Sequence, residues 1–114
     1  MASGVLGQKV ITSSSSGAGL VVYTVPSSTL AVCNIRIVNI SSAAQTVDLA
    51  IPDETDGTFD GLDALEDAAP LAVAAVLENT NIVLEAGRSV VVPTTGLDST
   101  GVNVVVTGIE ESTS

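Results

Sequence analysis

Alternation of apolar and polar positions is the strongest pattern in the chain, and it predicts short β-strands. Side chains of a strand point to opposite faces in turn, so a half-buried strand repeats every second residue. The longest example covers residues 30–40. One face there carries Ala31, Cys33, Ile35 and Ile37, and the other carries Leu30, Val32, Asn34, Arg36 and Val38.

Similar patterns recur along the chain and are separated by residues that favour turns. Val, Ile and Thr together make up 37 of the 114 residues, and these branched side chains fit a pleated surface. We therefore predict an all-β protein: a single antiparallel β-sandwich, jelly-roll-like, with a flexible N-terminal arm. The strands are expected near residues 20–25, 30–40, 47–51, 72–77, 82–84, 89–92 and 102–109, with at most one helical turn at 62–67.

This pattern divides the chain into three parts. Residues 1–17 contain a serine run and are expected to form the arm, residues 18–111 the sandwich, and residues 112–114 a frayed C-terminus. Val5, Leu6, Val10 and Ile11 are apolar residues of the arm. We interpret them as candidate interface residues, because they would gain from docking on a partner.

Composition and charge exclude several functions. The formal net charge is −10, with three Lys plus Arg against 13 Asp plus Glu, so binding to a nucleic acid backbone or an anionic membrane is not expected. The chain has no histidine and one cysteine, which excludes a Ser-His-Asp triad, an internal disulfide and a thiolate zinc site. The first residues do not read as a signal peptide, so we expect synthesis in the cytoplasm without secretion.

Only 14% of the residues are charged, whereas about 25% is usual, and the mean hydropathy is +0.55. Much of the surface must therefore be uncharged, and valine-rich strands with such a surface associate or aggregate. This favours a homo-oligomer, with a trimer as the first expectation.

An acidic loop offers the only cluster with possible chemistry. Asp56, Thr58, Asp60 and Asp67 have a spacing that resembles an EF-hand calcium loop. Position 12 is Asp instead of Glu, however, and the flanks do not read as helices, so we favour a solvated loop and expect no metal or cofactor. Asp63, Glu66 and Asp67 could supply a glycosidase carboxylate pair, which we disfavour because aromatic residues that line sugar clefts are scarce.

Four further side chains have a functional and a plain structural interpretation. Cys33 lies on the apolar face of its strand and is interpreted as a buried hydrophobe, not a reactive thiol. Lys9, Arg36 and Arg88 are the three cations. They serve solubility in the plain interpretation; in the functional one, they contact acidic groups of a partner, which suits the two-point binding of arginine.

The order of features along residues 18–111 resembles small β-sandwich virion proteins of tailed bacteriophages, especially marine and cyanobacterial phages. Arg88 departs from the pattern, because an acidic residue is expected after the turn glycine. The matching segments are Tyr23-Thr24-Val25-Pro26, Arg36-Ile37-Val38-Asn39, Ser41 to Ala44, Val47-Asp48-Leu49-Ala50, Pro70-Leu71, Leu84-Glu85-Ala86-Gly87 and Gly108-Ile109-Glu110-Glu111.

The resemblance implies a structural subunit of the virion without enzymatic activity. A capsid decoration, or cement, protein is the first expectation; it would bind the major capsid protein on the outer shell and stabilise contacts between capsomers. A neck, tail or baseplate component is the alternative. A lectin-like adhesive module is a further one, since β-sandwiches also serve that role.

Overall fold

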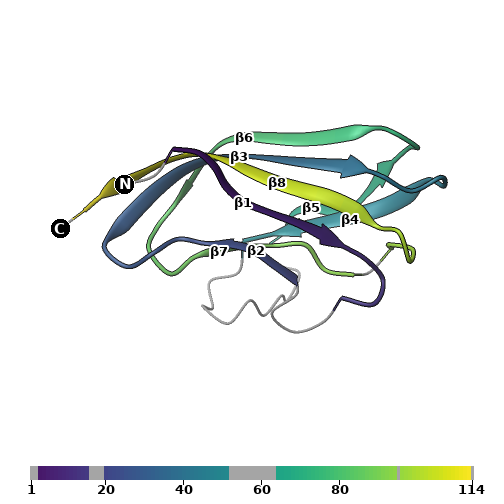
Figure 1. The fold of residues 1–114 in the computed structure, drawn as a ribbon, viewed down its shortest axis with the longest axis horizontal. Helices are drawn as coiled ribbons and strands as arrows, with labels where there is room; N and C mark the ends of the chain where they lie inside the picture. The colour runs from purple at the N-terminus through teal and green to yellow at the C-terminus, as the bar shows by residue number, and fades with distance from the viewer. Residues whose placement is uncertain (1–2, 16–19, 52–63, 95, 114) are drawn as a thin grey trace.

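The computed structural model describes residues 3–15, 20–51, 64–94 and 96–113, and these form eight β-strands (Figure 1). The described residues contain no α-helix, in agreement with the predicted all-β class. The strands are β1 (Ser3–Ile11), β2 (Val21–Thr24), β3 (Thr29–Asn39), β4 (Gln45–Ala50), β5 (Ala64–Leu71), β6 (Val76–Leu84), β7 (Ser89–Val91) and β8 (Val102–Ser112).

The strands make two packed antiparallel sheets, which confirms the predicted sandwich. Sheet A has the order β1-β8-β3-β6, and sheet B has the order β2-β7-β4-β5. In this arrangement the first strand pairs with the last, and the pairing continues inward along the chain: β1 with β8, β2 with β7, β3 with β6 and β4 with β5. This is one long hairpin, closed between β4 and β5, that is rolled up so that the successive strands of each arm alternate between the sheets, which is the topology of an eight-stranded jelly roll.

The core lies between the two sheets and is built from the faces that alternation predicts. Ala31, Cys33, Ile35 and Ile37 of β3 are all fully buried, and on β8 Val106 lies beside Ile35 and Val104 beside Ile37. Sheet B contributes alternate residues of β4 and β7 to the same cluster. The valine runs that could aggregate on an open edge are instead placed in central strands: Val90, Val91 and Val92 are fully buried.

Three expectations about the chain ends and the middle are wrong. Ser3–Ile11, expected in a flexible arm, is strand β1 and pairs with β8 along its length. Ala64–Leu71 is strand β5, where a helical turn was expected at 62–67, and residues 72–75 form a turn before β6. Strand β8 continues to Ser112, and the Thr113 N–H donates to the Ser28 carbonyl, so this end is paired and not frayed. In each case the backbone finds hydrogen-bond partners from distant strands, which local composition does not reveal.

Close approach of two segments fixes the place where β1 ends. Gly101 precedes β8 with φ +76°, and a Cβ on it would overlap the backbone carbonyl oxygen of Ile11. Only glycine combines this left-handed backbone with this proximity. The residue therefore sets how tightly the N-terminal strand is held against β8.

We predict that Gly101→Ala destabilises the protein far more than Gly4→Ala. Gly4 also has a positive φ, +97°, but a Cβ added to it would meet nothing within 4 Å. Both variants bear the cost of a left-handed alanine, about 1–2 kcal/mol, and only Gly101→Ala adds the overlap with Ile11. Urea unfolding of the two variants measures the difference, and equal losses would contradict the close approach.

Candidate functional site

The outer face of sheet A is the best-defined candidate for an interaction site. It is formed by the side chains of four strands that point away from the core, and several of its apolar members are exposed, with Val5 63% and Val83 61% accessible. Such exposure is unusual when it gathers on one face. The face consists of Val5, Gln8 and Val10 of β1, Asn103, Val105, Thr107, Ile109 and Glu111 of β8, Leu30, Val32, Asn34, Arg36 and Val38 of β3, and Val76, Glu78, Thr80 and Val83 of β6.

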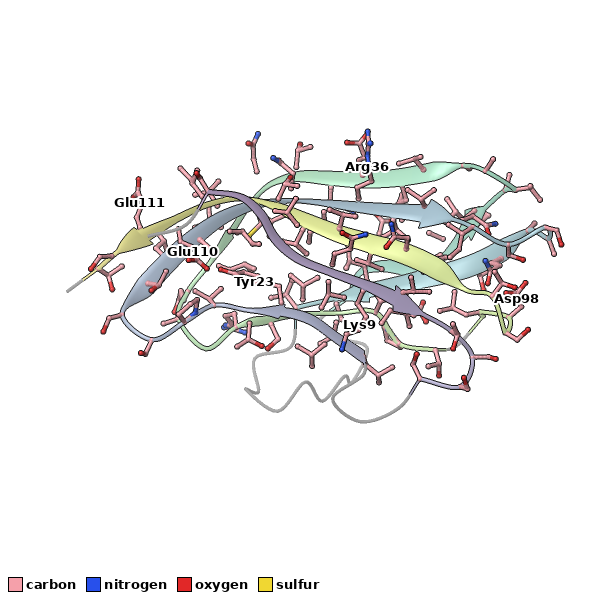
Figure 2. All side chains as sticks on the ribbon, viewed as in Figure 1. Lys9, Tyr23, Arg36, Asp98, Glu110 and Glu111 are labelled. Atoms are coloured by element: carbon pink, nitrogen blue, oxygen red, sulfur yellow. The ribbon has the colours of Figure 1, made fainter. Side chains whose placement is uncertain are left out.

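Register places these side chains in rows across the sheet. Val83, Val32 and Ile109 form an apolar row at one end, and Val76 and Val38 lie side by side at the other. Between them, Arg36 and Glu78 are direct neighbours, with Nη2 3.5 Å from Oε1, and both side chains are more than half exposed. Figure 2 shows Arg36 projecting from sheet A, away from sheet B.

The outer face carries little charge for a strongly acidic protein. Arg36, Glu78 and, at the end of β8, Glu111 are its ionisable residues; the first two balance each other and leave a formal charge of −1 on the face, while the whole chain carries −10. An exposed pair of this kind contributes only about 0–1 kcal/mol to stability. A hollow of about 480 Å³ lies beside the pair, lined by Asn34, Arg36, Glu78, Thr80, Val105 and Thr107. The face therefore offers polar groups at its centre and valines at both ends.

A buried polar network closes the end of the sandwich where β3 passes into β4. The Asn39 amide nitrogen donates to the carbonyls of Ala43, Leu71 and Ala72 at 3.0–3.1 Å. Its oxygen accepts from the Ser41 N–H and the Gln45 side chain. Asn39 is 2% exposed, so these bonds are made away from solvent. One side chain thus joins the β3–β4 corner to the β5–β6 turn.

Gln45 and Asp98 extend this network to the loop before β8. The Gln45 amide donates to the Gly101 carbonyl and accepts from the Asp98 N–H, each at 2.8 Å. The Asp98 carboxylate accepts from the N–H groups of Gly101 and Thr100 and from the Ser41 hydroxyl. The hydrogen bonds from Gly101 and Ser41 lower the pKa of Asp98 below its ordinary value of 3.8.

A second polar contact joins the sheets near the opposite end. The Tyr23 hydroxyl of β2 donates to Glu110 Oε2 of β8 at 2.5 Å (Figure 2). Burial, together with this hydrogen bond and the Glu110 charge, raises the pKa of Tyr23 above its ordinary value. Burial and the Glu110 charge also raise the pKa of Cys33. The thiol is fully buried and stays protonated, so its predicted role as a small core residue is supported.

The apolar residues predicted as interface contacts divide between two environments. Val5 and Val10 are exposed on the outer face of sheet A. Ile11 is fully buried in the core, so it is not available to a partner, whereas Leu6 is half-buried and packs against the core, and its contact role stays a prediction. The reason is that β1 belongs to sheet A, so its inward side chains pack in the core between the sheets.

The three cations lie in different places. Arg36 is on the outer face of sheet A beside Glu78. Lys9 is half-buried on edge strand β1, and Arg88 is half-buried in the turn between β6 and β7. The Arg88 carbonyl accepts from the Val25 N–H, and its own N–H donates to the Glu85 carbonyl. Of the three, Arg36 is the one best placed to meet a partner.

The calcium-loop residues Asp56, Thr58 and Asp60 lie outside the described residues, as does Asp63. Asp67 belongs to strand β5, so the helix that follows an EF-hand loop is not formed there. Glu66 accepts a hydrogen bond from Asn79 at 3.3 Å. Within the described part of the chain, no group of three or more His, Cys, Asp or Glu side chains could hold a metal ion. The same residues include no helix long and apolar enough to cross a membrane.

Sequence reasoning missed the polar network and most of the outer face. A signal for the network was present, because Asn39 continues the alternation of Cys33, Ile35 and Ile37 and so falls on the apolar face. A polar residue in that position must find buried partners. The rows of the outer face could not be found in this way, because they depend on the register between distant strands.

Comparison with known proteins does not identify this chain, since no protein family, curated protein or solved structure matches it. The fold is that of an eight-stranded jelly-roll sandwich, and its function has to be argued from the surface.

We predict that Asn39→Ala destabilises the protein by at least about 3 kcal/mol, because several buried polar groups lose their partners at about 1–3 kcal/mol each. Asn103→Ala, on the outer face of β8, removes the same side chain from a half-buried position and is the matched control. Chemical denaturation of both variants tests this. A similar small loss in the two would show that the network contributes little.

We also predict that Asp98 makes the protein sensitive to acid. Because its pKa is lowered in the folded state, its contribution is present above the unfolded value of about 4 and is lost as the pH falls through the lower folded value. Asp98→Asn should be less stable at pH 7 and lose less stability between pH 4 and 2. Urea unfolding across this range, with the exposed Glu111→Gln as a control, would detect it; parallel acid profiles for wild type and Asp98→Asn would refute it.

Proposed function

We propose that the protein is a structural subunit of a bacteriophage virion, and that it is a capsid decoration protein which binds the major capsid protein on the outer shell. The observation that carries the proposal is the outer face of sheet A, which carries little charge and several exposed valines. Its exposed valines and balanced Arg36–Glu78 pair suit contact with another protein surface. The resemblance of residues 18–111 to small phage virion proteins is the reason for proposing a phage particle as the assembly.

The fold is compatible with this role. Eight-stranded jelly rolls occur among viral capsid proteins and lectins. Asn39, Gln45 and Asp98 form a network of hydrogen bonds that holds one end of the sandwich together. A domain whose face carries little net charge fits a role in bracing neighbouring subunits better than one in catalysis.

A neck, tail or baseplate component shares the same surface argument and differs in copy number. The lectin-like alternative has one observation in its favour, the polar hollow beside Arg36. The sole tyrosine is buried, however, and points to Glu110, so it is not available on this face to stack on a sugar.

Quantitative mass spectrometry of purified particles tests the proposal. A decoration protein is expected at a copy number of the same order as the major shell protein, and Arg36→Glu should lower its occupancy without changing its melting temperature. Val73→Lys, an exposed site in the turn before β6, is the control and should be incorporated normally. A few copies per particle would favour the neck, tail or baseplate, and absence from particles would refute a virion role.

A further inference from the structure

A jelly roll of two open sheets has four edge strands, and three of them carry features that oppose pairing with another chain. Edge strand β5 contains Pro70 and two acidic residues. Edge strand β2 is only four residues long. Such features are how soluble sheets avoid edge-to-edge association.

Edge strand β1 is protected by its position. It has a bulge between Val5 and Gly7, and its Lys9 faces the inner side of the sheet. A Cβ on Gly7 would lie 2.5 Å from the Val22 carbonyl oxygen and 3.0 Å from Tyr23 Cβ, so β1 lies directly against β2. An added strand would find this edge covered by the neighbouring sheet.

Edge strand β6 is different. It is nine residues long and contains no proline, lysine or arginine, and Glu78 is its only charged residue. One bulge, where Asn81 has φ 59° and its N–H donates to Asn34 Oδ1, lies toward its far end. The segment from Val76 to Thr80 remains regular, so among the described strands it is the edge left open.

The hydrogen-bond pattern shows which groups of β6 face outward. The Asn39 N–H donates to the Ala75 carbonyl, so this pair begins the ladder with β3. Antiparallel ladders alternate between bonded and non-bonded pairs, and the Val38–Val76 and Arg36–Glu78 pairs are therefore non-bonded. The N–H and C=O groups of Val76 and Glu78 point away from β3, toward the open edge.

We propose that β6 pairs with β6 of a second copy of this chain, giving a two-fold dimer with one continuous eight-stranded sheet. An antiparallel edge is complementary to itself under a two-fold axis, since each donor meets an acceptor. The local charge also suits a second copy: two molecules of charge −10 repel overall, but at this edge the one acidic residue of β6, Glu78, is balanced by Arg36 of the same molecule. If the two-fold axis passes through Leu77, Glu78 lies opposite Val76 of the second copy. If it passes through Asn79, Glu78 lies opposite Thr80 of the second copy. Neither register places the two Glu78 side chains directly opposite each other.

Pairing in this way leaves the outer face of sheet A uncovered and doubles its width. The dimer could then use that face as the proposed function requires. The two ideas remain separable, because a monomeric protein that is abundant in particles would overturn the pairing and leave the virion role intact.

Sedimentation velocity across a concentration series, combined with amide hydrogen exchange, tests the pairing on the full chain. We expect a dimer at high concentration, in which the amides of Val76 and Glu78 exchange at least tenfold more slowly than in the dilute monomer. A monomer at every concentration, the trimer expected from composition, or a dimer with unprotected Val76 and Glu78 amides would each overturn it.

Two proline variants separate the edge from general effects of proline. Glu78→Pro removes an outward N–H that β3 does not use, and it should abolish the dimer. Val73→Pro is the control: the Ala75 N–H donates to the Ala72 carbonyl and Ala74 has φ 63°, a turn whose second position accepts proline. It should dimerise as wild type does. A dimeric Glu78→Pro would refute the proposal, and if that variant does not fold, the amide exchange of the wild type decides.

Discussion

The sandwich depends on one buried amide. Asn39 is the last residue of β3, and its side chain bonds at once to the β3–β4 corner, to the β5–β6 turn and, through Gln45, to the residues before β8. Strands that alternate between sheets must cross at the ends of the sandwich, where the ladders stop and backbone groups lose their partners. The Asn39 side chain supplies those partners. Without it, the end of the core would expose unsatisfied carbonyls to an apolar interior.

Placing the polar network inside has a consequence for the surface. The groups that could otherwise recognise a ligand, namely Asn39, Gln45, Asp98 and Tyr23, are used to join the two sheets. What remains on the outer face of sheet A is a set of exposed valines with one pair of opposite charges at its centre and Glu111 at its end. This division of roles suits a building block, whose specificity lies in shape and edge geometry more than in a pocket.

The four edge strands differ in how readily they could pair with another chain. Strands β1, β2 and β5 are covered, short or interrupted, whereas β6 has one charged residue and is regular from Val76 to Thr80. An edge and a face that meet along the same strand can serve two different contacts. Pairing along β6 would extend the sheet, and the extended face would remain available to a larger assembly.

The sequence by itself determined the all-β class, the alternation of β3 and the burial of Cys33, because period-two patterning and branched side chains act locally. It also identified Arg36 as outward-facing. Only the tertiary structure decided that residues 3–11 are a strand and that residues 64–71 are not helical, since both depend on partners far away in the chain. It likewise decided the role of Asn39, the pairing of Arg36 with Glu78 and the openness of β6. These three features depend on the register between distant strands and on the rolling of the hairpin, which pairs the first strand with the last. No local sequence pattern encodes pairing between segments so far apart in the chain.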